Sequence, residues 1–212
     1  MKVAVIVLVA VLGASPAHAA PDCAADADRL RAHLEEAETN TFRWNTTWAV
    51  LFGTAAVGQV VLAVTETKPF GKFDQAYRDT LYVGAGKATL AFAVRIVTPL
   101  HVSVPARNED RCAELVVLRS TVTTLAQKER DGFWFGHLGG LALNLAASGL
   151  LWSRHSFSDG ALSFAMSWPV GLLASYTQPR KSWHLWRAEH SSWSVAVAVH
   201  PERTMFSLAG EI

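Results

Sequence analysis

Charged residues are scarce in this chain, and their scarcity argues against several classes of protein. Only 17% of the 212 residues are Asp, Glu, Lys or Arg, against about a quarter in typical soluble domains. The formal net charge is +1, so the chain lacks the basic excess by which proteins attract nucleic acid or anionic lipid surfaces. We therefore expect no nucleic-acid partner.

Catalytic motifs are absent as well. The sequence contains no Gly-x-Ser-x-Gly, no His-Glu-x-x-His and no nucleophile beside a base. The tail histidines His184, His190 and His200 have a spacing that matches no standard metal site. The sequence therefore predicts a protein that is not an enzyme and that uses no cofactor and no metal.

Long apolar stretches are present in place of these motifs. Residues 44–64, 133–152 and 161–177 contain no Asp, Glu, Lys or Arg, and each approaches the ~20 residues that a helix needs to cross a bilayer. Residues 80–101 have the same character but include Lys87 and Arg95. The pattern predicts an all-α integral membrane protein with four transmembrane helices, whose first partner is the lipid bilayer.

The first 19 residues are typical of a secretory signal peptide. Lys2 precedes an apolar run over residues 3–12, and Ala17-His18-Ala19 fits the cleavage rule. The run is too short to span a bilayer. We expect the mature chain to enter the envelope of a bacterium and to lie in its inner (cytoplasmic) membrane.

Only two cysteines occur, Cys23 and Cys112, and both lie in polar segments outside the expected spans. An exported chain meets an oxidising compartment, in which paired thiols become disulfides. We expect a Cys23–Cys112 disulfide; the alternative is two unrelated free thiols.

Two polar segments, 22–43 and 108–132, lead into the first and third spans with a heptad seam. The first seam consists of Cys23, Ala27, Leu30, Leu34, Ala37, Thr41, Trp44 and Trp48. The second consists of Cys112, Leu115, Leu118, Val122, Leu125, Glu129, Gly132 and Gly136, with Glu129 as its polar exception. In each segment the cysteine lies about six helical turns before the aromatic residue that enters the membrane. The layout predicts two outward helical extensions that run in parallel, joined at their tips; the alternative is two independent surface helices.

In the tail, the repeat of the side-chain pattern changes from the helical period to an alternation of every second residue. Residues 193–199 and 206–212 alternate between larger and smaller side chains around Pro201, which predicts a β-hairpin. Two strands alone are marginally stable, so we expect the hairpin to pack on the helix pair or the membrane surface. The expected domains are therefore the signal peptide 1–19, the membrane domain 20–177 and an exported tail 178–212.

An exported N-terminus and four spans place Cys112 and the C-terminus on the exported side too. The connection over residues 65–79 and Arg154 would then lie inside. The outer segments carry more basic residues than these inner loops, which conflicts with the positive-inside rule. We follow the signal peptide, because long exported segments translocate largely regardless of charge.

Polar residues within the spans are the candidate site, because burying them is costly. Lys87 and Arg95 share one face of the second span, and His137 and Asn144 share one face of the third. We expect Arg95 to meet His137 or a helix-end carbonyl, and Lys87 to lie near Gln59 and Asn144. Both basic residues are also within snorkelling reach of the interfaces, and the amide and imidazole groups can serve simply to join helices.

These features favour a non-enzymatic envelope protein, a scaffold or interaction subunit that meets a protein partner through its exported helix pair or hairpin. The alternative is a small-molecule or ion transporter, or an accessory subunit of one, that uses the polar groups within the spans.

Overall fold

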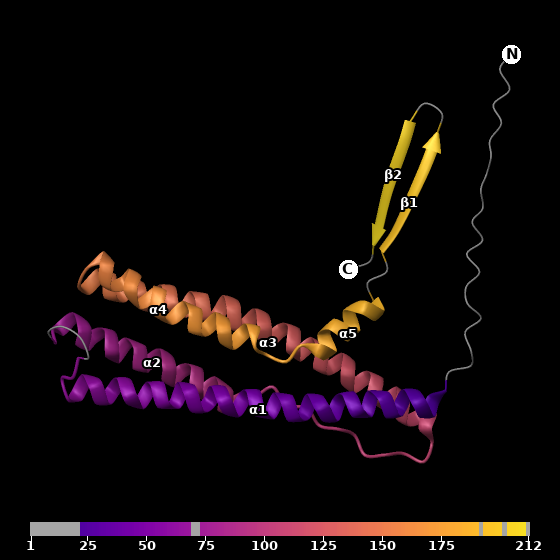
Figure 1. The fold of residues 1–212 in the computed structure, drawn as a ribbon, viewed down its shortest axis with the longest axis horizontal. Coiled ribbons are helices and arrows are strands. Elements are labelled where there is room, and N and C mark those ends of the chain that lie inside the picture. Colours follow the sequence, from indigo (N-terminus) through magenta and orange to yellow (C-terminus); the bar gives the residue numbers. More distant parts are fainter. Residues whose placement is uncertain (1–21, 69–72, 191–192, 201–202, 211–212) are drawn as a thin grey trace.

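The computed structural model describes residues 22–68 and 73–190 with their side chains, and 193–200 and 203–210 as backbone. The expected signal peptide, 1–19, lies outside the described residues. The fold is all-α in its main body, with five helices in the described part of the chain (Figure 1). Their bounds are α1 Cys23–Val64, α2 Gln75–Val97, α3 Arg111–Arg154, α4 Phe157–Tyr176 and α5 Lys181–His190.

The two long helices, α1 and α3, begin in the same way. The Asp22 carboxylate accepts hydrogen bonds from the backbone N–H groups of Ala24 and Ala25, both at 3.1 Å. Asp110 does the same for Cys112 and Ala113, at 2.9 and 3.1 Å. An N-cap of this kind stabilises a helix start by about 1 kcal/mol. The expected extension over 108–132 therefore starts as a helix at Arg111, because Asp110 is its cap.

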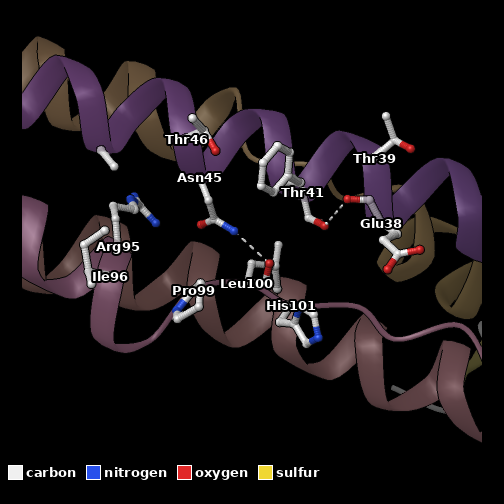
Figure 2. A pocket seen from close by; sticks show the side chains of 12 residues that line it. Glu38, Thr39, Thr41, Asn45, Thr46, Arg95, Ile96, Pro99, Leu100 and His101 are labelled. Atoms are coloured by element: carbon white, nitrogen blue, oxygen red, sulfur yellow. Dashed lines mark hydrogen bonds between the residues drawn. The ribbon is translucent and has the colours of Figure 1, made fainter.

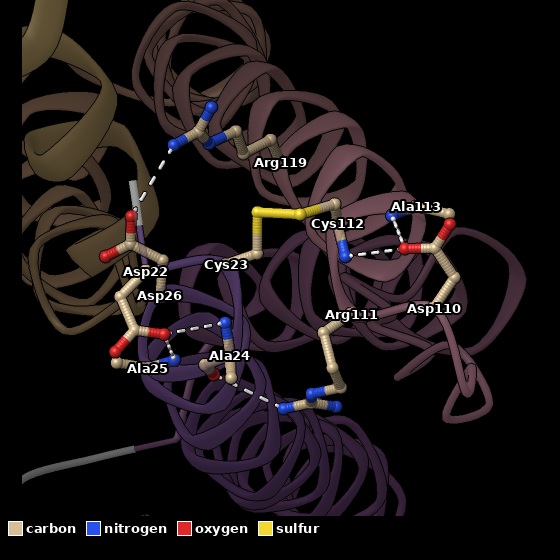
Figure 3. Close-up of a disulfide and its surroundings, with 10 residues drawn as sticks. All are labelled: Asp22, Cys23, Ala24, Ala25, Asp26, Asp110, Arg111, Cys112, Ala113 and Arg119. Atoms are coloured by element: carbon tan, nitrogen blue, oxygen red, sulfur yellow. Dashed lines mark hydrogen bonds and ion pairs between the residues drawn. A yellow bond between two sulfur atoms is a disulfide. The ribbon is translucent and has the colours of Figure 1, made fainter. Parts of the chain in front are cut away.

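The outer parts of α1 and α3, residues 23–43 and 111–132, lie side by side and form what we name the stem. The expected Cys23–Cys112 disulfide joins their first turns, with the two Cα atoms 5.0 Å apart (Figure 3). Both helices start at this bond and run in parallel toward the rest of the bundle (Figure 1). The stem core consists of Ala27, Leu30, Leu34, Ala37, Val102, Leu115, Leu118, Val122 and Leu125.

The heptad seam predicted for α1 is confirmed from Ala27 to Trp48, where every seam position is buried. In α3 it is confirmed from Leu115 to Glu129. At the next seam position the prediction was wrong, since Gly132 is exposed and Phe133 is buried in its place. The cause is a tertiary contact: the Phe133 ring packs against Tyr176 of α4 and Trp183 of α5, with centroids 5.8 and 5.7 Å away.

Below the stem the helices form two antiparallel hairpins, α1 with α2 and α3 with α4 (Figure 1). Small residues permit the close approach within each hairpin. A Cβ atom at Gly84 would lie 1.9 Å from the Gln59 Oε1 atom, and one at Gly160 would lie 2.6 Å from the Ser148 carbonyl oxygen. Contacts of α2 with α3 and α4 join the two hairpins.

Two of the four expected spans stand out by length and composition. In the part of the chain that the structure describes, α1 and α2 are the helices long and apolar enough to cross a membrane. Only 17% of the most apolar stretch of each is buried, whereas the core helix of a soluble protein would be mostly buried. The inner half of α3 and all of α4, which correspond to the other two expected spans, are not among these helices. They contain His137, Asn144 and Asp159.

The tail contains a helix that the sequence pattern did not predict, α5, which begins two residues after Pro179. Beyond α5 the backbone pairs as two antiparallel strands, β1 Trp193–His200 and β2 Arg203–Gly210, with Trp193 opposite Gly210. The side chains of these strands, and with them the expected packing of the hairpin, lie outside the described residues.

Candidate functional site

A polar cluster lies between the two hairpins, at mid-length of α2. The Lys87 Nζ atom donates hydrogen bonds to Ser167 Oγ at 2.8 Å, Asn144 Oδ1 at 3.3 Å and Ser163 Oγ at 3.4 Å. Ser167 also donates to Asn144 Oδ1 at 2.5 Å, and the Asn144 amide donates to the Gly140 carbonyl at 2.8 Å. Two helices, α3 and α4, thus contribute oxygen atoms around the ammonium group of a third, α2. Among the described residues, no carboxylate pairs with Lys87.

The other expected site residues lie apart from this cluster. Gln59 lies against Gly84 within the first hairpin. The His137 ring lies in the second hairpin, 4.2 Å from the Phe133 ring and 5.1 Å from the Tyr176 ring, and its Nδ1 atom is 3.1 Å from the Phe133 carbonyl oxygen.

Arg95 does not meet His137. Its Cζ atom lies 4.0 Å from the centroid of the Trp44 ring, within the first hairpin. The structure therefore brings Lys87 and Asn144 together and leaves Arg95, His137 and Gln59 in separate environments.

Aromatic residues mark one level at which the stem meets the rest of the bundle. Trp44 lies 21 positions after Cys23, and Phe133 lies 21 positions after Cys112, which is about 31 Å of helix in both cases. The Trp44 indole donates to the Ala174 carbonyl at 3.2 Å, and the Trp48 indole donates to Thr177 Oγ1 at 3.1 Å. These bonds fix the end of α4 against α1.

The Glu129 side chain binds the first turn of α5. The Glu129 side chain is fully buried in α3, and its Oε2 atom accepts a hydrogen bond of 2.7 Å from the Trp183 backbone N–H. The free N–H groups and partial positive charge of a helix N-terminus attract such a carboxylate. In the sequence, Glu129 is a polar residue that interrupts the apolar seam of α3. Its partner, the first turn of α5, could not be predicted, because the two lie on different helices that are far apart in the chain.

Further contacts hold α5 against the stem. The Gln178 amide donates to the Glu129 carbonyl at 2.8 Å, and His33 Nε2 lies 2.9 Å from Ser182 Oγ, which is fully buried. Lys181 forms an ion pair with Glu36 of α1. These bonds fix the position of α5 relative to both stem helices.

Stability should depend on pH through Glu129. Burial raises the pKa of Glu129 to about 7, from an ordinary value of 4.5. Between these two values the folded protein holds a proton that the unfolded chain releases, so stability is fullest below the lower value and falls as pH rises through the upper one. We expect the Tm in detergent to decrease between about pH 5 and about pH 8, and Glu129→Gln to flatten this decrease. Glu35→Gln, at an exposed position of α1, is the control; an unchanged slope in Glu129→Gln would contradict the assignment.

An ion network closes the top of the stem. The Arg31 guanidinium and the Glu114 carboxylate are both buried, with an Nε–Oε1 distance of 3.0 Å. Arg31 also donates to the Pro105 carbonyl at 2.8 Å, and Arg111 forms an ion pair with the second Glu114 oxygen. The hydrogen bond from Arg31 is the main cause that holds the pKa of Glu114 below its ordinary value.

These places provide hydrogen bonds and ion pairs that join helices. In the described part of the chain, no group of three His, Cys, Asp or Glu residues could hold a metal ion. The chain matches no protein-family model, no curated protein and no solved structure. Its function has to be inferred from the geometry of these residues.

Proposed function

We propose that this chain is a four-span envelope membrane protein that acts as a scaffold, holding α5 and the tail beyond it at a fixed height above the bilayer for a protein partner. The observation that supports this most directly is the docking of α5 on a disulfide-joined stem through the buried Glu129. A covalently joined helix pair resists bending and separation, so whatever it holds keeps its position.

The distribution of exposed apolar side chains supports four spans rather than two. Soluble proteins seldom expose continuous apolar faces, yet large apolar side chains are exposed along all four helices below the stem. They include Val57, Val61, Leu90, Ile96, Phe135, Leu138, Leu145, Leu162, Met166 and Leu173. Contact with lipid acyl chains would remove the unfavourable free energy of exposing this apolar surface to water.

The membrane arrangement can be tested by labelling with a membrane-impermeant maleimide. We expect Ala188→Cys, in α5, to react in intact cells, and Ser158→Cys, in the first turn of α4, to react only after permeabilisation. Both positions are exposed, and the native cysteines are held in the disulfide. The reverse pattern would contradict the proposed orientation and agree with the positive-inside count. Equal labelling of both positions from outside would contradict the spans.

The scaffold role can be tested by photo-crosslinking in cells. A photoreactive residue in place of Arg187, exposed on α5, should give one discrete adduct with another protein. The same residue at Val116, 68% exposed on the stem, is the control and should give none. Glu129→Arg should abolish the adduct by releasing α5. Absence of an adduct at Arg187, or an adduct that survives Glu129→Arg, would contradict the proposal.

A second candidate, ion or small-molecule transport, is favoured by the Lys87 ammonium, which has neutral oxygen partners and no carboxylate among the described residues. A scaffold should keep its α5 adduct in Lys87→Met. A transporter should lose flux in this variant while its bundle stays folded.

A further inference from the structure

A cleft opens on the first hairpin at the level of Trp44. It lies between α1, the end of α2 and the segment 99–101, and encloses about 580 Å³ (Figure 2). Its lining is mixed. Phe42 and Ile96, which are 70% and 59% exposed, provide apolar surface, while Arg95, Asn45 and Glu38 provide polar groups.

Arg95 brings to this cleft a positive charge that forms no ion pair among the described residues. One face of its guanidinium rests on the Trp44 ring, which leaves the N–H groups around its edge free to donate. The Arg95 Nε atom is buried and has no hydrogen-bond partner among the described residues. A buried donor of this kind is costly unless something accepts from it, and a planar guanidinium suits a phosphate well.

Asn45 provides a hydrogen-bond acceptor that has no donor among the described residues. Its amide nitrogen donates to the Leu100 carbonyl at 2.8 Å, which fixes the segment after α2, and its Oδ1 atom is buried without a partner in the described part of the chain. Figure 2 shows the Asn45 side chain between Arg95 and Leu100. A donor without an acceptor and an acceptor without a donor therefore lie in one cleft.

The charges of the cleft are ordered along α1. Glu38, at its outer end, is exposed and lies six positions before Trp44, which is about 9 Å along the helix axis. The positive charge of Arg95 thus lies at the end of the cleft nearer the two hairpins, and the negative charge of Glu38 lies at the end nearer the stem. A ligand that suits this order has an inner anion and an outer cation that can donate hydrogen bonds.

We propose that the cleft binds a phospholipid with a phosphoethanolamine headgroup, with its phosphate on Arg95, its ammonium directed toward Asn45 and Glu38, and an acyl chain along Ile96. The inference rests on the proposed membrane placement of α1 and α2. Trp44 is level with Phe133 and Tyr176 at the top of the proposed spans, where headgroups would lie. Charge complementarity selects this lipid, because an anionic headgroup without a cation would meet Glu38, and a choline headgroup has no N–H to donate.

The test is native mass spectrometry of the full chain, delipidated in detergent and then given phosphatidylethanolamine, phosphatidylcholine or phosphatidylglycerol with identical acyl chains. We expect one phosphatidylethanolamine to be retained about fivefold better than either other lipid, a preference of the size expected for one exposed charge pair. Arg95→Gln should lose about tenfold in retention. Glu38→Gln, at an exposed position, should keep lipid binding and lose the preference over phosphatidylcholine.

Arg180→Gln is the matched control, because Arg180 also rests on an aromatic ring, that of Phe133 at 4.6 Å, but outside the cleft. Equal retention of all three lipids, tightest retention of phosphatidylglycerol, or the same loss in Arg180→Gln as in Arg95→Gln would overturn the proposal. If the labelling pattern shows correct insertion and lipid selectivity is absent, only the lipid site fails. If the chain does not insert, the proposed function fails as well.

Discussion

Loss of the Cys23–Cys112 disulfide will lower the free energy of unfolding of the stem by about 4 kcal/mol, the effect expected for a cross-link that closes a loop of this length. The two cysteines are 89 positions apart, so the bond removes much freedom from the unfolded chain. Chemical denaturation of the purified protein in detergent, with and without reductant, measures the effect. Cys23→Ala should reproduce the result obtained with reductant.

Ion pairs at the tip of the stem provide the comparison for this prediction. Arg111 pairs with Asp28, and Arg119 lies 3.8 Å from Asp26. Exposed pairs of this kind contribute at most about 1 kcal/mol, so they cannot hold the tips together in place of the disulfide. An Asp28→Asn variant should unfold close to the wild type. Identical denaturation curves under oxidising and reducing conditions would refute the proposed contribution of the bond.

The stem was predictable because its signals are local and repeated. A heptad seam in each segment and a cysteine at each tip both point to one parallel pair. Helix α5 was not predictable in this way. It has only 10 residues, too few for a clear period, and its first turn depends on Glu129, which is more than 50 positions away in the chain.

The contacts of the polar groups in the expected spans were predictable only in part. Arg95 and His137 do lie toward the same end of the bundle, yet α2 packs chiefly with α1, and α3 with α4. Arg95 therefore meets Trp44 of its own hairpin, while His137 meets Tyr176 of the other. Helical periodicity fixes which residues share a face; it does not fix which helix lies opposite that face. Lys87 and Asn144 come together because the Lys87 side chain reaches from α2 to α3 and α4 of the second hairpin.

The second large effect concerns the buried ion network of the stem, where Glu114→Leu should lower the Tm in detergent by about 10 °C, the size expected when a buried pair loses one partner. Glu114 accepts from Arg31, from Arg111 and, at 3.4 Å, from the Asn108 backbone N–H. Its removal leaves the buried Arg31 guanidinium with the Pro105 carbonyl as its acceptor. Thermal unfolding followed by circular dichroism measures the change.

The reverse replacement should cost less. In Arg31→Met the Glu114 carboxylate keeps its ion pair with Arg111, so the charge that is left behind is still compensated. The double variant Arg31→Met/Glu114→Leu should recover most of the lost Tm, because replacing a whole buried pair by apolar side chains of similar volume is often neutral or stabilising. Leu30 and Leu118 already supply an apolar surface to this part of the stem. If the double variant is no more stable than Glu114→Leu alone, the loss comes from the missing Glu114 contacts themselves and not from an uncompensated Arg31 charge.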